Sequence, residues 1–168
     1  MGSQGVGSLR CGTVIEALVV NPDDWRLWRE LRLAALADAP AAFGSTLAEW
    51  SGTGDVEQRW RGRLHDVALN LVLVLNGAPV GMVSATAPDS EGQLELISLW
   101  VAPTARAQGV GDEAIRQVLG WARRECPAGR VVLSVKADNA HATRLYERHG
   151  FVDVGPSPDD PDERLMRR

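Results

Sequence analysis

The chain of 168 residues has two cysteines, a single lysine and no long apolar run. Cys11 and Cys126 stand far apart without the spacing of metal ligands, so neither a disulfide framework nor a zinc site is indicated. No apolar run reaches the roughly 18 residues of a membrane-spanning helix, and the first residues lack the apolar core of a signal peptide. We therefore expect a soluble, cytoplasmic protein that holds no metal.

The chain also lacks an excess of basic residues, since its formal net charge is −4. Proteins that bind nucleic acid normally carry a basic stripe. An acidic protein instead attracts cations. We therefore expect neither nucleic acid nor a membrane as partner, and a cationic small molecule suits this charge better.

Hydrophobic residues make up 45% of the chain, which is enough for one domain with one core. Residues 1–12 are rich in glycine and serine, so we expect a flexible tail followed by a single domain over residues 13–168. The apolar periodicity predicts an α/β protein. The predicted strands are 13–20, 68–75, 79–87, 94–101, 131–135, 151–154 and 164–168, and the predicted helices are about 22–39, 55–64, 112–124 and 139–149.

A glycine-rich turn joins the strand at 94–101 to the following helix, and it reads Val101-Ala-Pro103-Thr-Ala-Arg106-Ala-Gln-Gly109-Val-Gly111. The start of a helix presents unpaired backbone N–H groups and the positive end of the helix dipole. The glycines let this backbone approach an anion closely. The turn therefore predicts a site for a pyrophosphate, with Arg106 as an additional positive charge.

A second block follows the strand at 131–135 and reads Asn139-x-x-Ala142-x-x-Leu145-Tyr146-Glu147-x-x-Gly150-Phe151. The two blocks together resemble the GNAT acetyltransferase superfamily, whose acetyl-CoA pyrophosphate loop is similar to the first block. The resemblance is sharp from about residue 92 to residue 154. It implies a mixed α/β sheet of about six or seven strands, flanked by about four helices, in which strand four (94–101) splays away from strand five (131–135).

The resemblance implies acetyl-CoA as the co-substrate. It places pantetheine in the gap between the splayed strands, against the backbone of Leu99 and Val101, and the pyrophosphate on the amides of residues 108–112. The residues implied to bind the coenzyme are Leu99, Trp100, Val101, Arg106, Ala107, Gln108, Gly109, Val110, Gly111, Asp112, Asn139, Ala142 and Tyr146. Asp112 departs from the family, where Ser, Arg or Lys is more usual, and its carboxylate opposes a pyrophosphate.

Acetyl transfer from a thioester to an amine needs a neutral nucleophile, a donor to the oxyanion and a proton for the leaving thiolate. Tyr146 is the only tyrosine, and it matches the family's general acid. A phenol with a pKa of about 10 stays protonated at neutral pH and can protonate a thiolate with a pKa of about 8.5. Packing on an apolar helix face is the alternative role. The resemblance also implies the Val101 N–H as the oxyanion donor.

Glu95 is an ionisable residue inside an otherwise apolar strand, and strict alternation places it on the same side as Leu99 and Val101. It resembles the strand-four glutamate that many GNAT members use as a base through water. An amine with a pKa of about 10 has to lose a proton at neutral pH before it can attack. A carboxylate that pairs with arginine is the alternative role of Glu95, and other candidates for the base are Glu49, Glu91 and His65.

These features predict an N-acetyltransferase that moves an acetyl group from acetyl-CoA to a primary amine of a small cationic molecule, by direct transfer in a ternary complex. Acetylation of a peptide or protein N-terminus and a non-catalytic acyl-CoA sensor remain alternatives. A Rossmann or P-loop nucleotide site is disfavoured, because a third spaced glycine and Gly-Lys-Ser/Thr are missing. Family members often pair through their C-terminal strands, so the resemblance also implies a homodimer.

Overall fold

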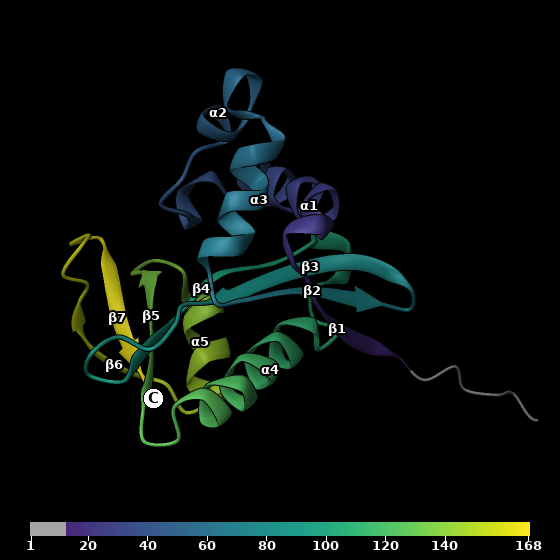
Figure 1. The fold of residues 1–168 in the computed structure, drawn as a ribbon. Helices are drawn as coiled ribbons and strands as arrows, with labels where there is room; N and C mark the ends of the chain where they lie inside the picture. Colours follow the sequence, from purple (N-terminus) through teal and green to yellow (C-terminus); the bar gives the residue numbers. More distant parts are fainter. Residues whose placement is uncertain (1–12) are drawn as a thin grey trace, which may run out of the picture.

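One mixed sheet forms the centre of the protein (Figure 1). The computed structural model describes residues 13–168, so the expected tail and Cys11 lie outside the described residues. The strands lie in the order β1-β2-β3-β4-β5-β7-β6, and only β4 and β5 are parallel neighbours. Their bounds are β1 (Ile15–Val19), β2 (Leu69–Leu75), β3 (Ala78–Ala85), β4 (Gln93–Val101), β5 (Arg130–Lys136), β6 (Val152–Pro156) and β7 (Glu163–Arg167).

Helices cover both faces of this sheet (Figure 1). One face carries α1 (Trp25–Asp38) and α3 (Glu57–Asp66), with the short α2 (Leu47–Trp50) between them in sequence, and the other carries α4 (Val110–Glu125) and α5 (Ala140–Arg148). The predicted α/β class, the seven strands and the four predicted helices are confirmed, and the structure adds the one-turn helix α2, which was not expected. Within residues 13–168, no helix is both long and apolar enough to cross a membrane.

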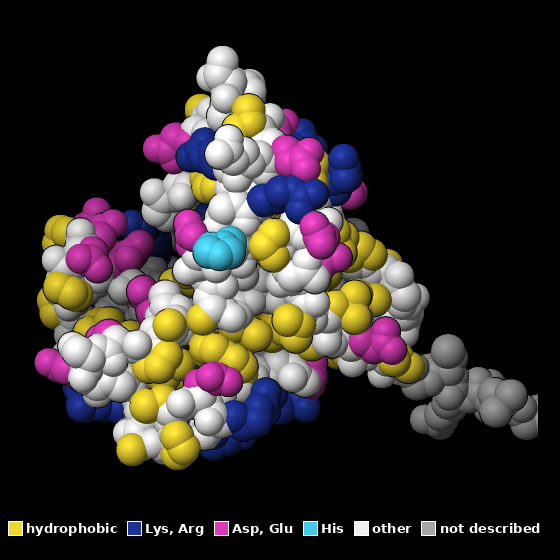
Figure 2. All heavy atoms as spheres, viewed as in Figure 1, with side chains coloured by type: hydrophobic (Ala, Val, Ile, Leu, Met, Phe, Trp, Pro, Cys, Tyr) yellow, Lys and Arg dark blue, Asp and Glu magenta, His cyan; other side chains and the backbone are white. Residues whose placement is uncertain are grey.

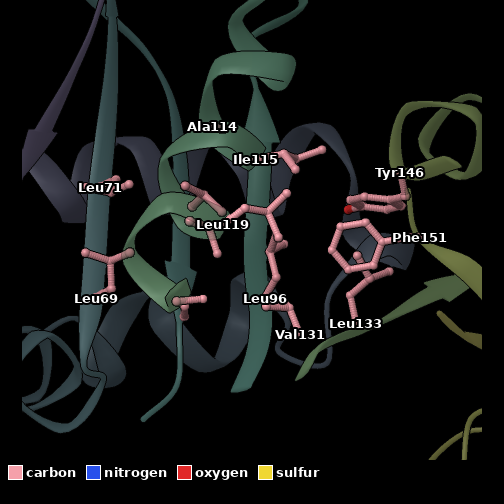
Figure 3. Close-up of a cluster of buried hydrophobic side chains, with 14 of the residues drawn as sticks. Leu69, Leu71, Leu96, Ala114, Ile115, Leu119, Val131, Leu133, Tyr146 and Phe151 are labelled. Atoms are coloured by element: carbon pink, nitrogen blue, oxygen red, sulfur yellow. The ribbon is translucent and has the colours of Figure 1, made fainter. Parts of the chain in front are cut away.

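Strand β2 is buried along its whole length, because helices lie on both of its sides. Leu71 and Leu73 point toward α4, whereas Val72 and Val74 join the core beneath α1 and α3. Figure 3 shows how α4 places Ala114, Ile115 and Leu119 against Leu69, Leu71 and Leu96 of the sheet. A strand that is covered on both faces reads as a continuous apolar run rather than an alternating one.

Strands β4 and β5 pair only at their beginnings, from Gln93 with Arg130 to Glu95 with Val132. The pairing of β4 with β5 ends there, which confirms the predicted splay. Strand β4 also contains a β-bulge against β3, where Ser98 adopts a positive φ of 59°. A bulge adds one residue to a strand and so shifts its alternation by one position.

Because of this bulge, the prediction that Glu95 shares a face of β4 with Leu99 and Val101 is wrong. Leu94 and Leu96 belong to the core on the α4 side, and beyond the bulge Leu99 and Val101 pack against that same core. Glu95 lies between Leu94 and Leu96 in the strand, so it faces the opposite side of the sheet, toward α1 and α3. Strict alternation does not hold across Ser98, because the bulge inserts one unpaired residue.

Candidate active site

A cavity of about 500 Å³ opens beside the end of β4, where the sheet splays. Its walls come from the last residues of β4, the loop before α4, helix α5 and the segment that follows α1. This volume falls in the range typical of small-molecule sites. The lining residues are Ala39, Ala42, Phe43, Leu99, Trp100, Val101, Ala105, Arg106, Ala107, Gly109, Gly111, Asp112, Asn139, His141, Ala142, Leu145, Tyr146 and Arg148.

The loop before α4 presents backbone amides to this cavity. Its last residue, Gly109, has a φ of 84° and forms the N-terminal boundary of α4. The first helical hydrogen bond runs from the Glu113 N–H to the Gly109 carbonyl (3.0 Å), so the amides of residues 110–112 have no helical acceptor. At Gly111 the packing is close for a different reason, because a Cβ there would lie 3.0 Å from Leu145 Cδ2 of α5, which would have to shift slightly. The loop thus has the donors that an anion needs.

Arg106 lies at the cavity wall, but its guanidinium is already engaged. Its Nε donates to the Val101 carbonyl (3.0 Å), and its terminal nitrogen pairs with Asp38 at the end of α1. Asp38 also accepts a hydrogen bond from Trp100 Nε1 (2.9 Å). The hydrogen bonds from Trp100 and Arg106 hold the pKa of Asp38 below its usual range. Arg106 therefore fixes the loop against β4 and α1.

Tyr146 of α5 is nearly buried, with 7% of its surface exposed, and lines the cavity. Its ring meets Phe151 edge to face, with ring centroids 5.9 Å apart, and Figure 3 shows the two rings beside Leu133. Burial raises the pKa of the Tyr146 phenol above its ordinary value, so the phenol keeps its proton at neutral pH. This position is compatible with both roles expected for Tyr146, general acid and packing on an apolar helix face.

Two further cavity residues open helix α5. The Asn139 side chain caps the helix by accepting a hydrogen bond from the Ala142 N–H (3.1 Å). This cap fixes the first turn of α5, and both Asn139 and Ala142 line the cavity. Gln108, in contrast, donates to the Thr104 carbonyl (2.9 Å) and braces the loop from within.

Glu95 is half-buried at the last position of β4 that pairs with β5, and it lies outside the cavity lining. Burial, together with the negative charges of Asp159 and Glu163, raises the pKa of Glu95. Figure 2 shows acidic side chains gathered over the β6–β7 end of the molecule, which carries Asp159 and Glu163. Among residues 13–168, no arginine lies within ion-pair distance of Glu95, so the structure does not support its alternative role as an arginine partner.

The other candidates for a base lie away from the cavity. Glu49 caps α2 by accepting a hydrogen bond from the Thr46 N–H (2.8 Å). Glu91 is exposed in the turn between β3 and β4, and His65 is exposed at the end of α3, 3.0 Å from Asp66. Of these candidates for the base, only Glu95 lies on β4, at the point where β4 separates from β5.

Asp112 connects α4 to α5. Its carboxylate lies 2.9 Å from His149 Nε2 and accepts a hydrogen bond from Arg148 (3.1 Å). Burial opposes ionisation, but the hydrogen bonds from His149 and Arg148 outweigh it and hold the pKa of Asp112 below its usual range. The negative charge that departs from the family pattern is therefore compensated locally, and Arg148 is held by it at the cavity wall.

Replacement of Asp112 should change acetyl-CoA affinity and thermal stability in opposite directions. We expect Asp112→Ser to bind acetyl-CoA severalfold more tightly, because the change removes a repulsive charge and frees Arg148. Because the pKa of Asp112 is lowered in the fold, its ion pairs stabilise the protein above the unfolded-state pKa of about 3.9 and lose this effect at lower pH. The variant should thus melt earlier than the parent at neutral pH, and the difference should close in acid. Calorimetry and thermal denaturation test this, and an unchanged or weaker affinity contradicts it.

Sequence reasoning missed part of the surroundings of β4. Ala39, Ala42 and Phe43 line the cavity although they carry no motif. Arg32 of α1 and Arg63 of α3 both reach the hydroxyl of Ser98 at the bulge. Arg32 follows Trp28 by four residues and thus lies on the buried face of α1, which was the available signal.

Comparison with known sequences supports an acyl-transfer fold. A sequence model of the Acetyltransferase (GNAT) family matches residues 26–151. YdaF of Bacillus subtilis, provisionally named a ribosomal N-acetyltransferase, is 26% identical over 101 residues, which are 60% of this chain and 55% of that protein. N-acetylaspartate synthetase of Rattus norvegicus is 35% identical over 86 residues, which are 51% of this chain and 28% of that protein. The match thus spans about half of one curated relative and about a quarter of the other.

Solved structures share the fold over nearly the whole chain. The PaiA N-acetyltransferase from Thermoplasma acidophilum, in complex with coenzyme A, has a TM-score of 0.72 at 13% identity and covers 92% of this chain and 98% of its own. The spermidine/spermine N-acetyltransferase SpeG from Vibrio cholerae has a TM-score of 0.70 at 18% identity and covers 92% of each chain. Identities this low establish a common fold and no more.

Proposed function

Since the chain belongs to the Acetyltransferase (GNAT) family, we propose that it transfers an acetyl group from acetyl-CoA to the primary amine of a small molecule, in a ternary complex. One observation carries the proposal. Gly111 and Asp112, whose amides have no helical acceptor, the end of β4 and Tyr146 all line one cavity beside the splayed strands, whereas Val110 and Gln108 do not line it.

The residues around the cavity fit the coenzyme. The amides of residues 110–112 hold its pyrophosphate, and Gly111 has no Cβ to obstruct its approach. The end of β4, Leu99 to Val101, is not paired with β5 and is available to the pantetheine. Bound acetyl-CoA supplies an activated acyl thioester. Asn139, Ala142 and the ring of Tyr146 form the opposite wall.

Two side chains handle protons in this proposal. Glu95 accepts the proton of the incoming ammonium. The proton passes through water, because the Glu95 carboxylate lies outside the cavity lining. The raised pKa of Glu95 makes it a stronger base than an exposed glutamate. Tyr146 donates a proton to the departing thiolate, since burial keeps the phenol protonated. The Val101 N–H, expected from the family resemblance, stays our candidate for the oxyanion donor.

The acceptor is proposed to be small. Ala39, Ala42 and Phe43 line the same cavity as the coenzyme residues, so this segment limits the room left for an acceptor, which suits a compact amine better than an extended peptide. The names of the relatives point to different acceptors, namely a ribosomal component, spermidine or spermine, and aspartate. Primary amines are cations at neutral pH, in keeping with the net charge of −4.

A homodimer stays a prediction. Strand β6 is the edge strand at the C-terminal side of the sheet (Figure 1), and Val152 and Val154 on it are exposed by 60% and 39%. An open, apolar edge strand is suited to pairing with a second copy.

Thiol release tests the proposed function. The purified chain with acetyl-CoA should release coenzyme A only when an acceptor amine is added, and the acetylated amine should be found by mass spectrometry. Tight binding of acetyl-CoA without acetylation of any amine in a broad library would favour the sensor alternative. Acetylation of peptides but not of small amines would favour the N-terminal acetyltransferase alternative.

A glycine pair isolates the coenzyme loop. Gly109 and Gly77 both have a φ of 84° with room for a Cβ, but Gly77 lies in the turn between β2 and β3, outside the cavity lining. Both alanine variants strain a left-handed residue and should lose similar stability. Only Gly109→Ala should weaken acetyl-CoA binding, by about tenfold or about 1.4 kcal/mol. Calorimetry measures both, and equal affinities of the two variants contradict the assignment of the loop.

A further inference from the structure

Two arginines converge on the bulge of β4 from the helices above it. Arg32 Nη1 of α1 lies 3.5 Å from Ser98 Oγ, and Arg63 Nη2 of α3 lies 3.4 Å from the same oxygen. Only 8% of the Arg32 surface is exposed, and Arg63 is half-buried. Ser98 has a positive φ of 59°, a conformation that non-glycine residues adopt at a cost. The bulge thus holds a hydroxyl where two guanidinium groups meet.

Within residues 13–168, no carboxylate lies within ion-pair distance of either guanidinium. Burial lowers the pKa of Arg32 to about 10, and burial together with the charge of Arg32 lowers the pKa of Arg63 to about 10. The indole N–H of Trp28, whose ring lies 5.5 Å from the Arg63 guanidinium, is also buried without an acceptor in the described part of the chain. The cluster is therefore rich in donors and lacks an anion. Buried arginine is normally paired.

The two arginines differ in how much of their donor capacity is used. Arg63 also donates to Asn70 Oδ1 (2.9 Å) and Ser84 Oγ (3.2 Å), which fixes its position on β2 and β3. Arg32 has only the long contact with Ser98 and a stacking contact with the ring of Phe43, at 4.6 Å. Most of the five N–H donors of Arg32 thus remain available, and a guanidinium fork suits a carboxylate.

The cluster also lies next to the site. Phe43, which stacks on Arg32, lines the cavity, and Ser98 immediately precedes the cavity residues Leu99 to Val101. Glu95 lies three residues before Ser98, about 10 Å away at the usual rise of a strand, and the acidic end of β6 and β7 raises its pKa. One side of the splay thus offers cationic donors and the other offers carboxylates.

We propose that Arg32, supported by Arg63 and Ser98, binds a carboxylate group of the acceptor, so that the substrate is a small amino acid-like molecule whose amine points toward Glu95. This inference rests on the proposed function and refines it. The amine keeps the positive charge expected from the acidic chain, and the carboxylate supplies the anion that the arginine pair lacks. The acceptor is then a zwitterion rather than a polyamine.

Matched acceptors test the inference on the unaltered protein. Three trios of equal chain length differ only in the group opposite the amine: β-alanine, propylamine and diaminopropane; γ-aminobutyrate, butylamine and putrescine; δ-aminovalerate, pentylamine and cadaverine. We expect the carboxylate to have the highest kcat/KM in at least one trio, by about tenfold or more, as for a charge-assisted hydrogen bond. Phosphoethanolamine, as a further acceptor, separates a carboxylate site from a phosphate site.

Each result is decisive. Preference for the diamines or the plain amines in every trio overturns the carboxylate inference but leaves the proposed function standing. Preference for phosphoethanolamine overturns it in favour of a phosphate. Absence of acetyl transfer to every amine counts against the proposed function itself. Butyrate, which has no amine, should inhibit competitively against the preferred acceptor, whereas butyramide should not.

A variant separates recognition from a structural role. Arg32→Met should raise the KM for the preferred carboxylate acceptor by about tenfold to a hundredfold and abolish inhibition by butyrate. The KM for acetyl-CoA should not change. Its melting temperature should equal or exceed that of the parent, since an unpaired buried charge is replaced by an apolar group. Arg26→Met, at an exposed arginine of the same helix, is the control. A melting temperature well below that of the parent, with unchanged KM, would show that Arg32 is only structural.

Discussion

Tyr146→Phe should lower kcat about a hundredfold or more while the affinity for acetyl-CoA stays nearly unchanged. The change removes one phenolic O–H, and proton donation by a positioned side chain contributes rate factors of about 10² to 10⁴. The ring remains in its edge-to-face contact with Phe151, so the cavity wall and the packing of α5 persist. Steady-state kinetics give kcat, and calorimetry gives the affinity. If turnover is undiminished, another group or water is the acid.

The matched control is the partner ring. Phe151 is buried beside Tyr146 but is absent from the cavity lining. Phe151→Leu should lower thermal stability and keep most of kcat, because it alters packing and removes no proton donor. Since burial raises the pKa of Tyr146, the phenol should also stay protonated well above neutral pH. The raised pKa of Tyr146 would be contradicted by a fall in kcat that is centred below a pH of about 10 in the parent and absent from Tyr146→Phe.

Glu95→Gln should lower kcat/KM about a hundredfold at neutral pH and change the shape of the pH profile. In the parent, activity should fall as acid protonates Glu95, and this fall should come at higher pH than for an exposed glutamate, because burial, Asp159 and Glu163 raise the pKa. In the variant, the rate should keep rising toward the amine's own pKa of about 10, since solvent must then remove the proton. A profile that coincides with that of the parent would remove Glu95 from the mechanism.

Asp159→Asn supplies the control for this charge effect. Asp159 is exposed, and its negative charge is one of the causes that raise the pKa of Glu95. Its removal should move the acid limb of the profile to lower pH and leave the plateau rate unchanged. If this limb does not move, the group that titrates is not Glu95.

Local signals in the sequence were sufficient for much of the fold. The turn at Asn76 and Gly77 predicts a hairpin, and both residues have positive φ values between β2 and β3. The apolar spacing of Ile115 and Leu119 correctly identifies the buried face of α4. Helix α2 was missed because a single capped turn has no periodicity to detect.

The bulge at Ser98 marks the limit of such reasoning. Alternation predicted that Glu95 shares a face with Leu99 and Val101, and one extra residue in β4 reverses this relation. A bulge depends on the pairing of β4 with β3, which no local pattern of residues announces. Likewise, Asp112 read as a charge that opposes an anion, and its neutralising partners His149 and Arg148 come from another helix.

By itself, the sequence determined the α/β class, the hairpin, the glycine-rich loop before α4 and the family to which the chain belongs, because these depend on the order and spacing of neighbouring residues. Tertiary structure alone decided which charges meet. It engaged Arg106 with Asp38, joined Asp112 to His149, and brought Arg32 and Arg63 from separate helices to one hydroxyl on β4. Charge interactions and burial depend on distance in space. Residues that are 31 or 66 positions apart in the sequence, such as Arg32 and its partners Arg63 and Ser98, come close together only when the chain folds.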